Sequence, residues 1–387
     1  MKRLLAAALA ALCLAALPAC GAAKTEESAP VQEEAPAPPP EPTPEELAAR
    51  EVEDLLSSMT LEEKVGQLFF VRCPAESAVE DVTTYHLGGY VLFGRDFADK
   101  TADAIIQTLR DYQEAAAADT GIPLLLGVDE EGGTVVRVSS NPHLRGEKYR
   151  SPQKLLSAGG TEALVADTAD KDALLSALGI NVNLAPVADV STSSADFIYD
   201  RTCGLDASGT AECIRAVVEQ MASDGMGSVL KHFPGYGSNV DTHTGIAVDN
   251  RSLDQFRAAD FLPFSAGMEA GGGKAAVLVS HNIMTAVDDA LPASLSPAVH
   301  DLLRTELGFD GVVMTDDLAM DAVAAYAEDG AVAVMALQAG NDLIITTDYR
   351  TQIPKVLEAL EAGTLSMDTI DTACRRLLTW KQSLGLL

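Results

Sequence analysis

The sequence is poor in positive charge and in aromatic residues. Its 387 residues include 27 Lys and Arg against 57 Asp and Glu, which gives a formal net charge of −30, and a single Trp. Because the acidic residues are spread through the chain, its electrostatic field opposes nucleic acid and anionic lipid headgroups. We therefore expect no nucleic-acid partner.

Cysteine is also scarce, and neither cysteine nor histidine follows a metal-binding pattern. The six cysteines are Cys13, Cys20, Cys73, Cys203, Cys213 and Cys374. The last four are scattered and typical of small apolar core residues, although disulfides are possible outside the cytoplasm. No His-x-His or His-Glu-x-x-His occurs, so we expect neither a metal nor an organic cofactor.

The N-terminus has the pattern of an export signal. Met-Lys-Arg at 1–3 precedes an Ala/Leu-rich run to Leu17, too short to span a bilayer with polar flanks. The run ends in Leu-Pro-Ala-Cys at 17–20, which resembles the signal of bacterial lipoproteins, in which Cys20 becomes the lipidated N-terminus. The alternative is a plain signal peptide with a chance cysteine. We expect a signal at 1–19 and an extracytoplasmic protein attached to the membrane only by lipid on Cys20.

Residues 20–44 are rich in Ala, Pro, Glu, Gln and Ser, with three consecutive prolines at 38–40. Such a composition cannot bury enough apolar surface to fold, and it indicates a disordered, semi-extended tether. The folded domain is therefore expected at 45–387, and we expect it to be a monomer.

Short apolar runs alternate with helical segments through this domain. The eight predicted strands lie at 67–71, 89–93, 123–128, 181–186, 228–232, 276–281, 311–315 and 342–346. Predicted helices between them include 102–118, 162–178, 210–223, 253–269, 297–307 and 330–339. Continuous apolar strands alternating with helices indicate a parallel sheet covered on both faces. Eight units favour a single-domain (β/α)8 TIM-type barrel, with an open doubly wound sheet as the alternative.

Polar residues follow five of the predicted strands. They are Arg95 and Asp96, Asp129 and Glu130, Lys231 and His232, His281, and Asp316 and Asp317. Barrel enzymes place catalysis at the C-terminal ends of their strands, so these side chains are expected at one mouth.

A metal-dependent hydrolase is one chemistry for such a mouth. It would use as ligands His232, His243, His281, Asp241 and Asp129. The spacing and the lysine beside His232 argue against it.

A glycosidase needs a group that protonates the leaving oxygen and one that attacks the anomeric carbon. Asp316, directly after the buried run 311–315, is a candidate nucleophile. His243 suits acid/base catalysis at neutral pH, and Asp241 two residues earlier could orient its imidazole. The competing interpretation is that Asp316 caps a helix and His243 is a surface residue.

Motifs from Met59 onward resemble those of glycoside hydrolase family 3, in its single-domain bacterial β-N-acetylglucosaminidase subfamily. They are Met-Thr-Leu-Glu-Glu-Lys-Val-Gly-Gln (59–67), Gly-Gly-Tyr-Val-Leu-Phe (88–93), Asp-Glu-Glu-Gly-Gly (129–133) with Arg137, Asn-Leu-Ala-Pro-Val (183–187), Lys-His-Phe-Pro-Gly (231–235), Pro-Ala-Ser-Leu-Ser (292–296), Glu-Leu-Gly-Phe (306–309) through Asp317, and Ala-Gly-Asn-Asp (339–342). Asp-Thr-His at 241–243 distinguishes this subfamily from family 3 β-glucosidases.

This resemblance implies a retaining mechanism with Asp316 as nucleophile and His243 with Asp241 as the acid/base dyad. It further implies that the N-acetylglucosamine ring is held by Asp129, Arg137, Arg201, Lys231 and His232. Arg137 has a competing role as the structural partner of a mouth carboxylate. Tyr236 departs from the family, which usually has a histidine there, and residues 197–200 and Cys203 also differ.

The sequence thus predicts a lipid-anchored exo-β-N-acetylglucosaminidase that removes terminal β-linked N-acetylglucosamine, for example from peptidoglycan fragments. One alternative is a phosphorylase, since a neutral histidine repels phosphate less than a carboxylate does. A second alternative is a sugar-binding lipoprotein without catalysis.

Overall fold

The computed structural model describes residues 42–239, 247–324, 326–327 and 330–387, and Thr43–Leu387 form one compact unit. Its strands are β1 Phe69–Arg72, β2 Gly89–Leu92, β3 Leu125–Val128, β4 Val182–Asn183, β5 Gly227–Phe233, β6 Val248–Asp249, β7 Ala275–Val279, β8 Ile283–Met284, β9 Val313–Thr315 and β10 Ile344–Thr346.

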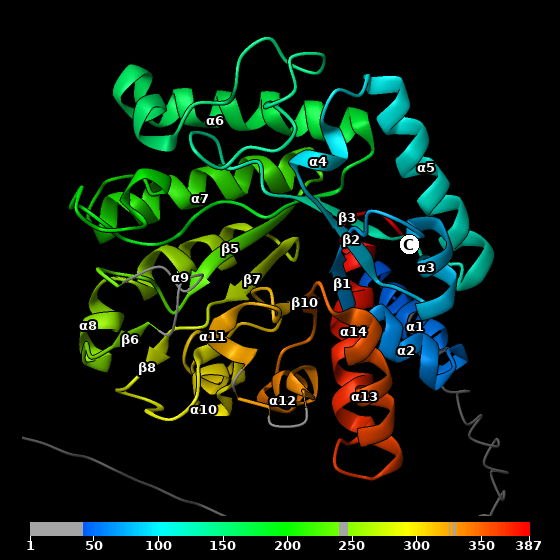
Figure 1. Ribbon diagram of the computed structural model, residues 1–387. Helices are drawn as coiled ribbons and strands as arrows, with labels where there is room; N and C mark the ends of the chain where they lie inside the picture. The colour runs from blue at the N-terminus through cyan, green and yellow to red at the C-terminus, as the bar shows by residue number, and fades with distance from the viewer. Residues whose placement is uncertain (1–41, 240–246, 325, 328–329) are drawn as a thin grey trace, which may run out of the picture. The chain divides into compact units, whose positions relative to one another are not determined.

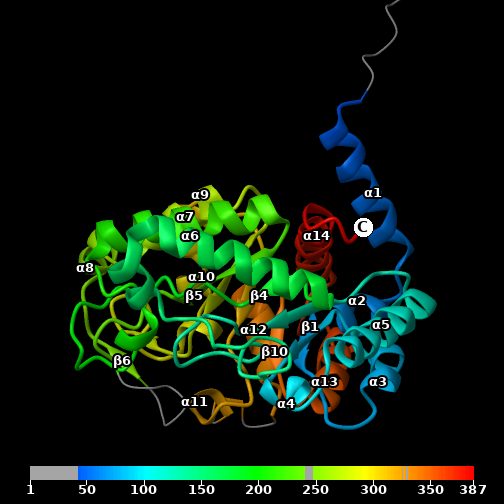
Figure 2. The same cartoon turned by 90° about the horizontal axis from the view of Figure 1, so that it is seen from above.

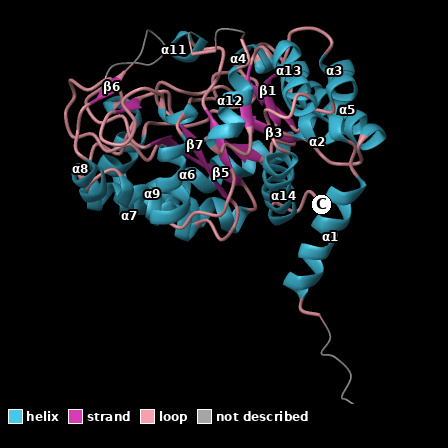
Figure 3. Ribbon diagram, turned by 90° about the horizontal axis from the view of Figure 1, so that it is seen from below, coloured by secondary structure: helices cyan, strands magenta, loops and turns pink. Residues whose placement is uncertain are grey.

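Eight of these strands form a parallel sheet in the order β10-β1-β2-β3-β4-β5-β7-β9. A parallel bridge between Met314 and Leu343, and a hydrogen bond from the Thr315 amide to the Leu343 carbonyl, join the two edges. The sheet therefore closes into a barrel, with the strands inside and the helices outside (Figures 1 and 3). All eight predicted strands and the TIM-type barrel are confirmed.

The helices that surround the barrel are α1 Pro44–Ser58, α2 Leu61–Gln67, α3 Ala78–Tyr85, α4 Gly94–Phe97, α5 Ala102–Asp119, α6 Pro152–Leu178, α7 Ala207–Asp224, α8 Leu253–Ala258, α9 Phe261–Ala270, α10 Pro297–Asp301, α11 Asp321–Ala324, α12 Val332–Ala339, α13 Tyr349–Glu361 and α14 Met367–Ser383. Glu53 of α1 pairs with Arg375 of α14, so the first and last of these helices lie side by side (Figure 2). Within the described ranges, no helix is both long and apolar enough to cross a membrane.

One predicted helix, 253–269, was wrong as a single helix. The segment 253–269 breaks between α8 and α9, where Ala259 leaves helical geometry at φ −130° and ψ −75°. There the buried Asp260 accepts a hydrogen bond from Arg251 Nη1 at 2.7 Å, which occupies the Asp260 carboxylate at the break. The segment 297–307 continues from α10 into a wider π-helix, Leu302–Glu306.

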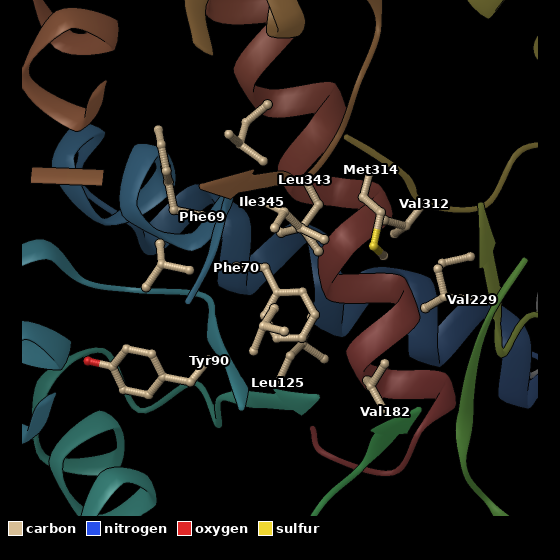
Figure 4. Packing of buried hydrophobic residues seen from close by; sticks show 14 of the residues in the cluster. Phe69, Phe70, Tyr90, Leu125, Val182, Val229, Val312, Met314, Leu343 and Ile345 are labelled. Carbon is tan, nitrogen blue, oxygen red and sulfur yellow. The ribbon is translucent and has the colours of Figure 1, made fainter. Parts of the chain in front are cut away.

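Apolar side chains of the strands fill the barrel and the space under the helices. Phe70, Leu125, Val182, Met314 and Ile345 belong to this buried cluster (Figure 4). Gly127 on β3 leaves room for the Phe70 ring, since a Cβ at this position would lie 2.3 Å from Phe70 Cζ. A close-packed core of this kind holds the strand ends, and the side chains that follow them, in fixed positions.

The cysteines Cys73, Cys203, Cys213 and Cys374 are all buried free thiols. Burial raises the pKa of Cys73 to about 12, and it also raises the pKa of Cys374. We expect all four thiols to resist a thiol reagent such as dithionitrobenzoate in the native protein and to react together once urea unfolds it. Immediate reaction of any of these four thiols in native buffer would contradict this packing.

Candidate active site

A cavity of about 400 Å³ lies at the C-terminal mouth of the barrel. Six of the predicted site residues line it, namely Asp129, Arg137, Arg201, Lys231, His232 and Asp316. Apolar side chains of Val91, Leu184, Leu278 and Ile345 line other parts of the same cavity. The mouth therefore combines fixed charges with apolar surface, as ligand cavities commonly do.

Lys231 and His232 are consecutive in β5, yet both line the cavity. Successive side chains of a regular strand point to opposite faces, but the pairing register of β5 with β7 shifts between Leu230 and Phe233. An irregularity of this kind re-aims a side chain, and bulges are frequent beside active sites.

Lys231 is the centre of a buried ion cluster. Its Nζ lies 2.6 Å from Asp129 Oδ1 and 2.7 Å from Glu131 Oε1. Burial would lower the pKa of Lys231, but the two carboxylates outweigh it and hold that pKa above its ordinary value. Lys231 is therefore a permanently charged group, and Asp129, with 17% of its side chain exposed, presents a carboxylate to the cavity.

Glu131 is a site residue that the sequence analysis missed. It accepts hydrogen bonds from Arg201 Nε at 2.9 Å and Arg201 Nη2 at 2.7 Å, in addition to its pair with Lys231. Burial would raise its pKa, but Lys231 and Arg201 together hold the pKa of Glu131 far below its usual range. The sequence did contain a signal for Glu131. Residues two apart in an extended segment share a face, so Glu131 should point to the same side as Asp129, which was already a candidate.

Glu130 was expected at the mouth, and this expectation was wrong. Its side chain is fully buried, and its carboxylate accepts hydrogen bonds from the backbone amides of Arg137 at 2.7 Å and Val138 at 2.6 Å. The intervening residue of the extended segment thus faces away from the cavity and holds the loop that carries Arg137.

Asp189 is the second residue that the sequence analysis missed. Its Oδ2 lies 2.8 Å from His232 Nδ1 and accepts the His232 amide at 3.1 Å, while Oδ1 accepts the Tyr236 amide at 2.7 Å. Arg201 Nη2, which can only donate, lies 3.2 Å from His232 Nε2. These contacts assign the His232 proton to Nδ1 and leave Nε2 as an acceptor.

This tautomer can be measured. We expect nitrogen-15 spectra of His232 to show a protonated Nδ1 and an unprotonated Nε2 at neutral pH, because a carboxylate faces one nitrogen and a guanidinium the other. A His232→Gln variant assigns the signals. Protonation at Nε2 would contradict the hydrogen-bond assignment.

Asp316 follows β9 directly and lines the cavity. Its amide donates to the Val279 carbonyl at 3.0 Å, and its Oδ1 accepts the Asp317 amide at 2.8 Å. In Asp317, by contrast, Oδ1 accepts the Thr347 amide at 3.2 Å and Oδ2 accepts the Thr347 hydroxyl at 2.9 Å. Asp317 therefore joins two loops, and both carboxylates line the cavity.

Asp241 and His243 lie outside the described residues. The chain on both sides of them is tied together, since Asn239 Nδ2 donates to Asp249 Oδ2 at 2.7 Å. Arg251 pairs with Asp249 at 2.7 Å and with Asp260 at 2.7 Å. The described residues on either side of the predicted dyad, Asn239 and Asp249, are therefore held together.

The remaining candidates take different positions around the cavity. Arg137 Nη2 lies 3.9 Å from Asp129 Oδ2, a distance compatible with both roles considered for it. His281 is fully buried, with Nδ1 2.7 Å from Ser294 Oγ. Tyr236 is also buried, and its ring packs edge-on against His232 at 5.1 Å between centroids. Arg95 lines a neighbouring cavity instead.

No three His, Cys, Asp or Glu side chains within the described ranges come together as a metal site. Of the five zinc ligands considered from the sequence, Asp241 and His243 lie outside these ranges.

Comparison with known proteins gives the family. The glycosyl hydrolase family 3 N terminal domain matches residues 60–380. The chain is 34% identical over 291 residues to a β-hexosaminidase of Stenotrophomonas maltophilia (strain K279a), across 72% of this chain and 82% of that protein. It is 29% identical over 320 residues to an uncharacterized secreted glycosyl hydrolase of Arthroderma benhamiae, across 79% and 87%.

Among solved structures, a glycoside hydrolase family 3 β-N-acetylglucosaminidase from Paenibacillus sp. str. FPU-7 superposes with a TM-score of 0.78 at 31% identity. The match covers 85% of this chain and 63% of that one, so this chain spans less than two thirds of that structure. A charged cavity at the C-terminal mouth of a (β/α)8 barrel is typical of barrel enzymes. The chain belongs to glycosyl hydrolase family 3, and it is a glycosidase.

Proposed function

We propose that the protein is a retaining exo-β-N-acetylglucosaminidase that hydrolyses terminal β-linked N-acetylglucosamine. The observation that carries this proposal is the single cavity that brings Asp316 together with the Lys231 cluster, Arg201 and His232. A relative called a β-hexosaminidase and a solved β-N-acetylglucosaminidase support the same substrate.

In the proposed mechanism, Asp316 attacks the anomeric carbon while His243, oriented by Asp241, protonates the departing oxygen. A covalent glycosyl-enzyme forms, and His243 then takes a proton from the water that hydrolyses it. The carboxylate of Asp129 accepts hydrogen bonds from sugar hydroxyls, and Lys231 and Arg137 donate to the sugar. Because His232 Nε2 accepts from Arg201 Nη2, His232 would serve the sugar site by orienting the Arg201 guanidinium.

The proposal also covers the cellular location of the protein and the larger molecule from which it removes the sugar. We infer an extracytoplasmic enzyme made as a signal peptide (1–19), a lipid on Cys20, a tether (20–44) and the catalytic barrel (45–387). The relative called secreted supports export. A monomer held by its lipid, acting on peptidoglycan fragments during cell-wall turnover, fits this arrangement.

A panel of aryl glycosides tests the proposal. We expect turnover of the aryl β-N-acetylglucosaminide, with the matched β-glucoside and β-xyloside hydrolysed far more slowly. Product analysis in phosphate buffer should give free N-acetylglucosamine. Sugar 1-phosphate as the main product would replace hydrolysis with phosphorolysis, and no turnover of any glycoside would favour a binding protein.

A further inference from the structure

A second cavity of about 400 Å³ adjoins the active site, and we call it the arginine pocket. Its three arginines are Arg72, the last residue of β1, Arg95 of α4 and Arg350 of α13. Arg72 lines both this pocket and the catalytic cavity. The two spaces therefore share a wall at the same mouth of the barrel.

Arg72 is the least compensated of the three guanidinium groups. Arg350 Nη2 pairs with Asp81 Oδ2 at 2.6 Å, and Arg95 donates to the Cys73 carbonyl and lies 3.6 Å from Asp96. Arg72 instead stacks over the Phe93 ring at 4.3 Å and forms no ion pair within the described residues. Its buried Nε finds no hydrogen-bond partner among them.

The chemistry of the pocket points to an anion. Among its lining residues, the three arginines face one carboxylate, that of Asp348, in a chain whose formal net charge is −30. The planar guanidinium fork matches a carboxylate, with which it forms paired charge-assisted hydrogen bonds. A buried donor without a partner gains most from such a ligand, because its desolvation is already complete.

We propose that the arginine pocket binds a carboxylate on the aglycone, so that the enzyme favours substrates whose released part is anionic. This inference rests on the proposed function. Terminal N-acetylglucosamine carries no charge, so a carboxylate that reaches Arg72 from a bound substrate must belong to the part that leaves. Sugar acids and acidic peptides are aglycones of this kind.

The test compares two substrates that differ only in charge. They are the β-N-acetylglucosaminides of N-acetyltyrosine and of N-acetyltyrosinamide, which share one phenol leaving group. We expect a higher kcat/KM for the carboxylate in the wild type, and a ratio that falls about tenfold in Arg72→Gln. Raising the salt to 0.5 M should lower the wild-type ratio as well. Arg95→Gln, at a more exposed site, gives a second variant if Arg72→Gln fails to fold.

Arg110→Gln on the exposed face of α5 is the matched control, and it should leave the ratio unchanged. Equal rates for the two substrates, or a ratio that Arg72→Gln does not change, would overturn the pocket alone. Lys148 and Lys154 line a separate groove. If only changes at these lysines lowered the kcat/KM ratio of the two substrates, the carboxylate would bind in that groove, and the proposal for the arginine pocket would be overturned. No turnover of either substrate would refute the proposed function itself.

Discussion

Replacing Asp316 with alanine is expected to lower kcat for an aryl β-N-acetylglucosaminide by about 10⁴-fold or more while the fold is retained. The reason is that Asp316 directly follows β9 and lines the cavity, and the proposed mechanism forms its covalent bond there. Circular dichroism and thermal unfolding establish the fold, and initial rates establish the loss.

Asp310→Ala is the matched control for this loss. Asp310 is an exposed carboxylate at the opposite end of the same strand, so its removal should leave kcat close to the wild-type value. Added azide should restore part of the Asp316→Ala activity by entering the space of the lost carboxylate and forming a glycosyl azide. A kcat within tenfold of wild type in Asp316→Ala would remove Asp316 from the mechanism.

Replacing Lys231 with methionine is expected to destabilise the protein by about 3 kcal/mol and to abolish turnover. Methionine fills a similar volume but leaves Glu131 and Asp129 without the ammonium that lies 2.7 Å and 2.6 Å from them. Breaking a buried ion pair by removing one partner is costly because the remaining charge stays out of water. Urea unfolding at pH 7 measures the change.

Two further variants separate burial from charge in this result. Arg257→Met breaks an exposed ion pair in which Arg257 Nε lies 2.6 Å from Glu306 Oε1. This change should alter the free energy of unfolding little. The double variant Lys231→Met with Asp129→Asn removes the charge of one of the two carboxylates that had paired with Lys231, and it should recover part of the lost stability. If Lys231→Met unfolds at the same urea concentration as Arg257→Met, the buried cluster does not stabilise the fold.

The sequence predicted the barrel well because apolar runs and helical segments repeat at regular spacing. The strand at 311–315, for example, is continuous in hydrophobicity, and the structure places β9 inside it. The helix at 253–269 was predicted as one although Pro263, in the first turn of α9, is a sequence signal for a new helix start. At its break the buried Asp260 pairs with Arg251, nine residues earlier, and a periodic pattern does not contain such a contact.

The sequence predicted only part of the active site, because it contains residue types and positions but not the partners of each side chain. Residue type and position after a strand identified Lys231, His232 and Asp316, which the structure brings into one cavity. Glu131 and Asp189 were missed because their importance comes from the partners they meet across the barrel, Arg201 and His232. Choosing Glu131 over Glu130 required the two-residue spacing from Asp129 to be applied beyond the end of the strand, into a segment that was not predicted as extended.

Mass spectrometry of a trapped intermediate tests the central claim most directly. Incubation with an activated 5-fluoro derivative of N-acetylglucosamine should slow the second step and let the glycosyl-enzyme accumulate. After digestion, the account predicts that the added sugar is attached to Asp316. A sugar attached to another residue, or active enzyme that turns over this substrate without any covalent adduct, would contradict it.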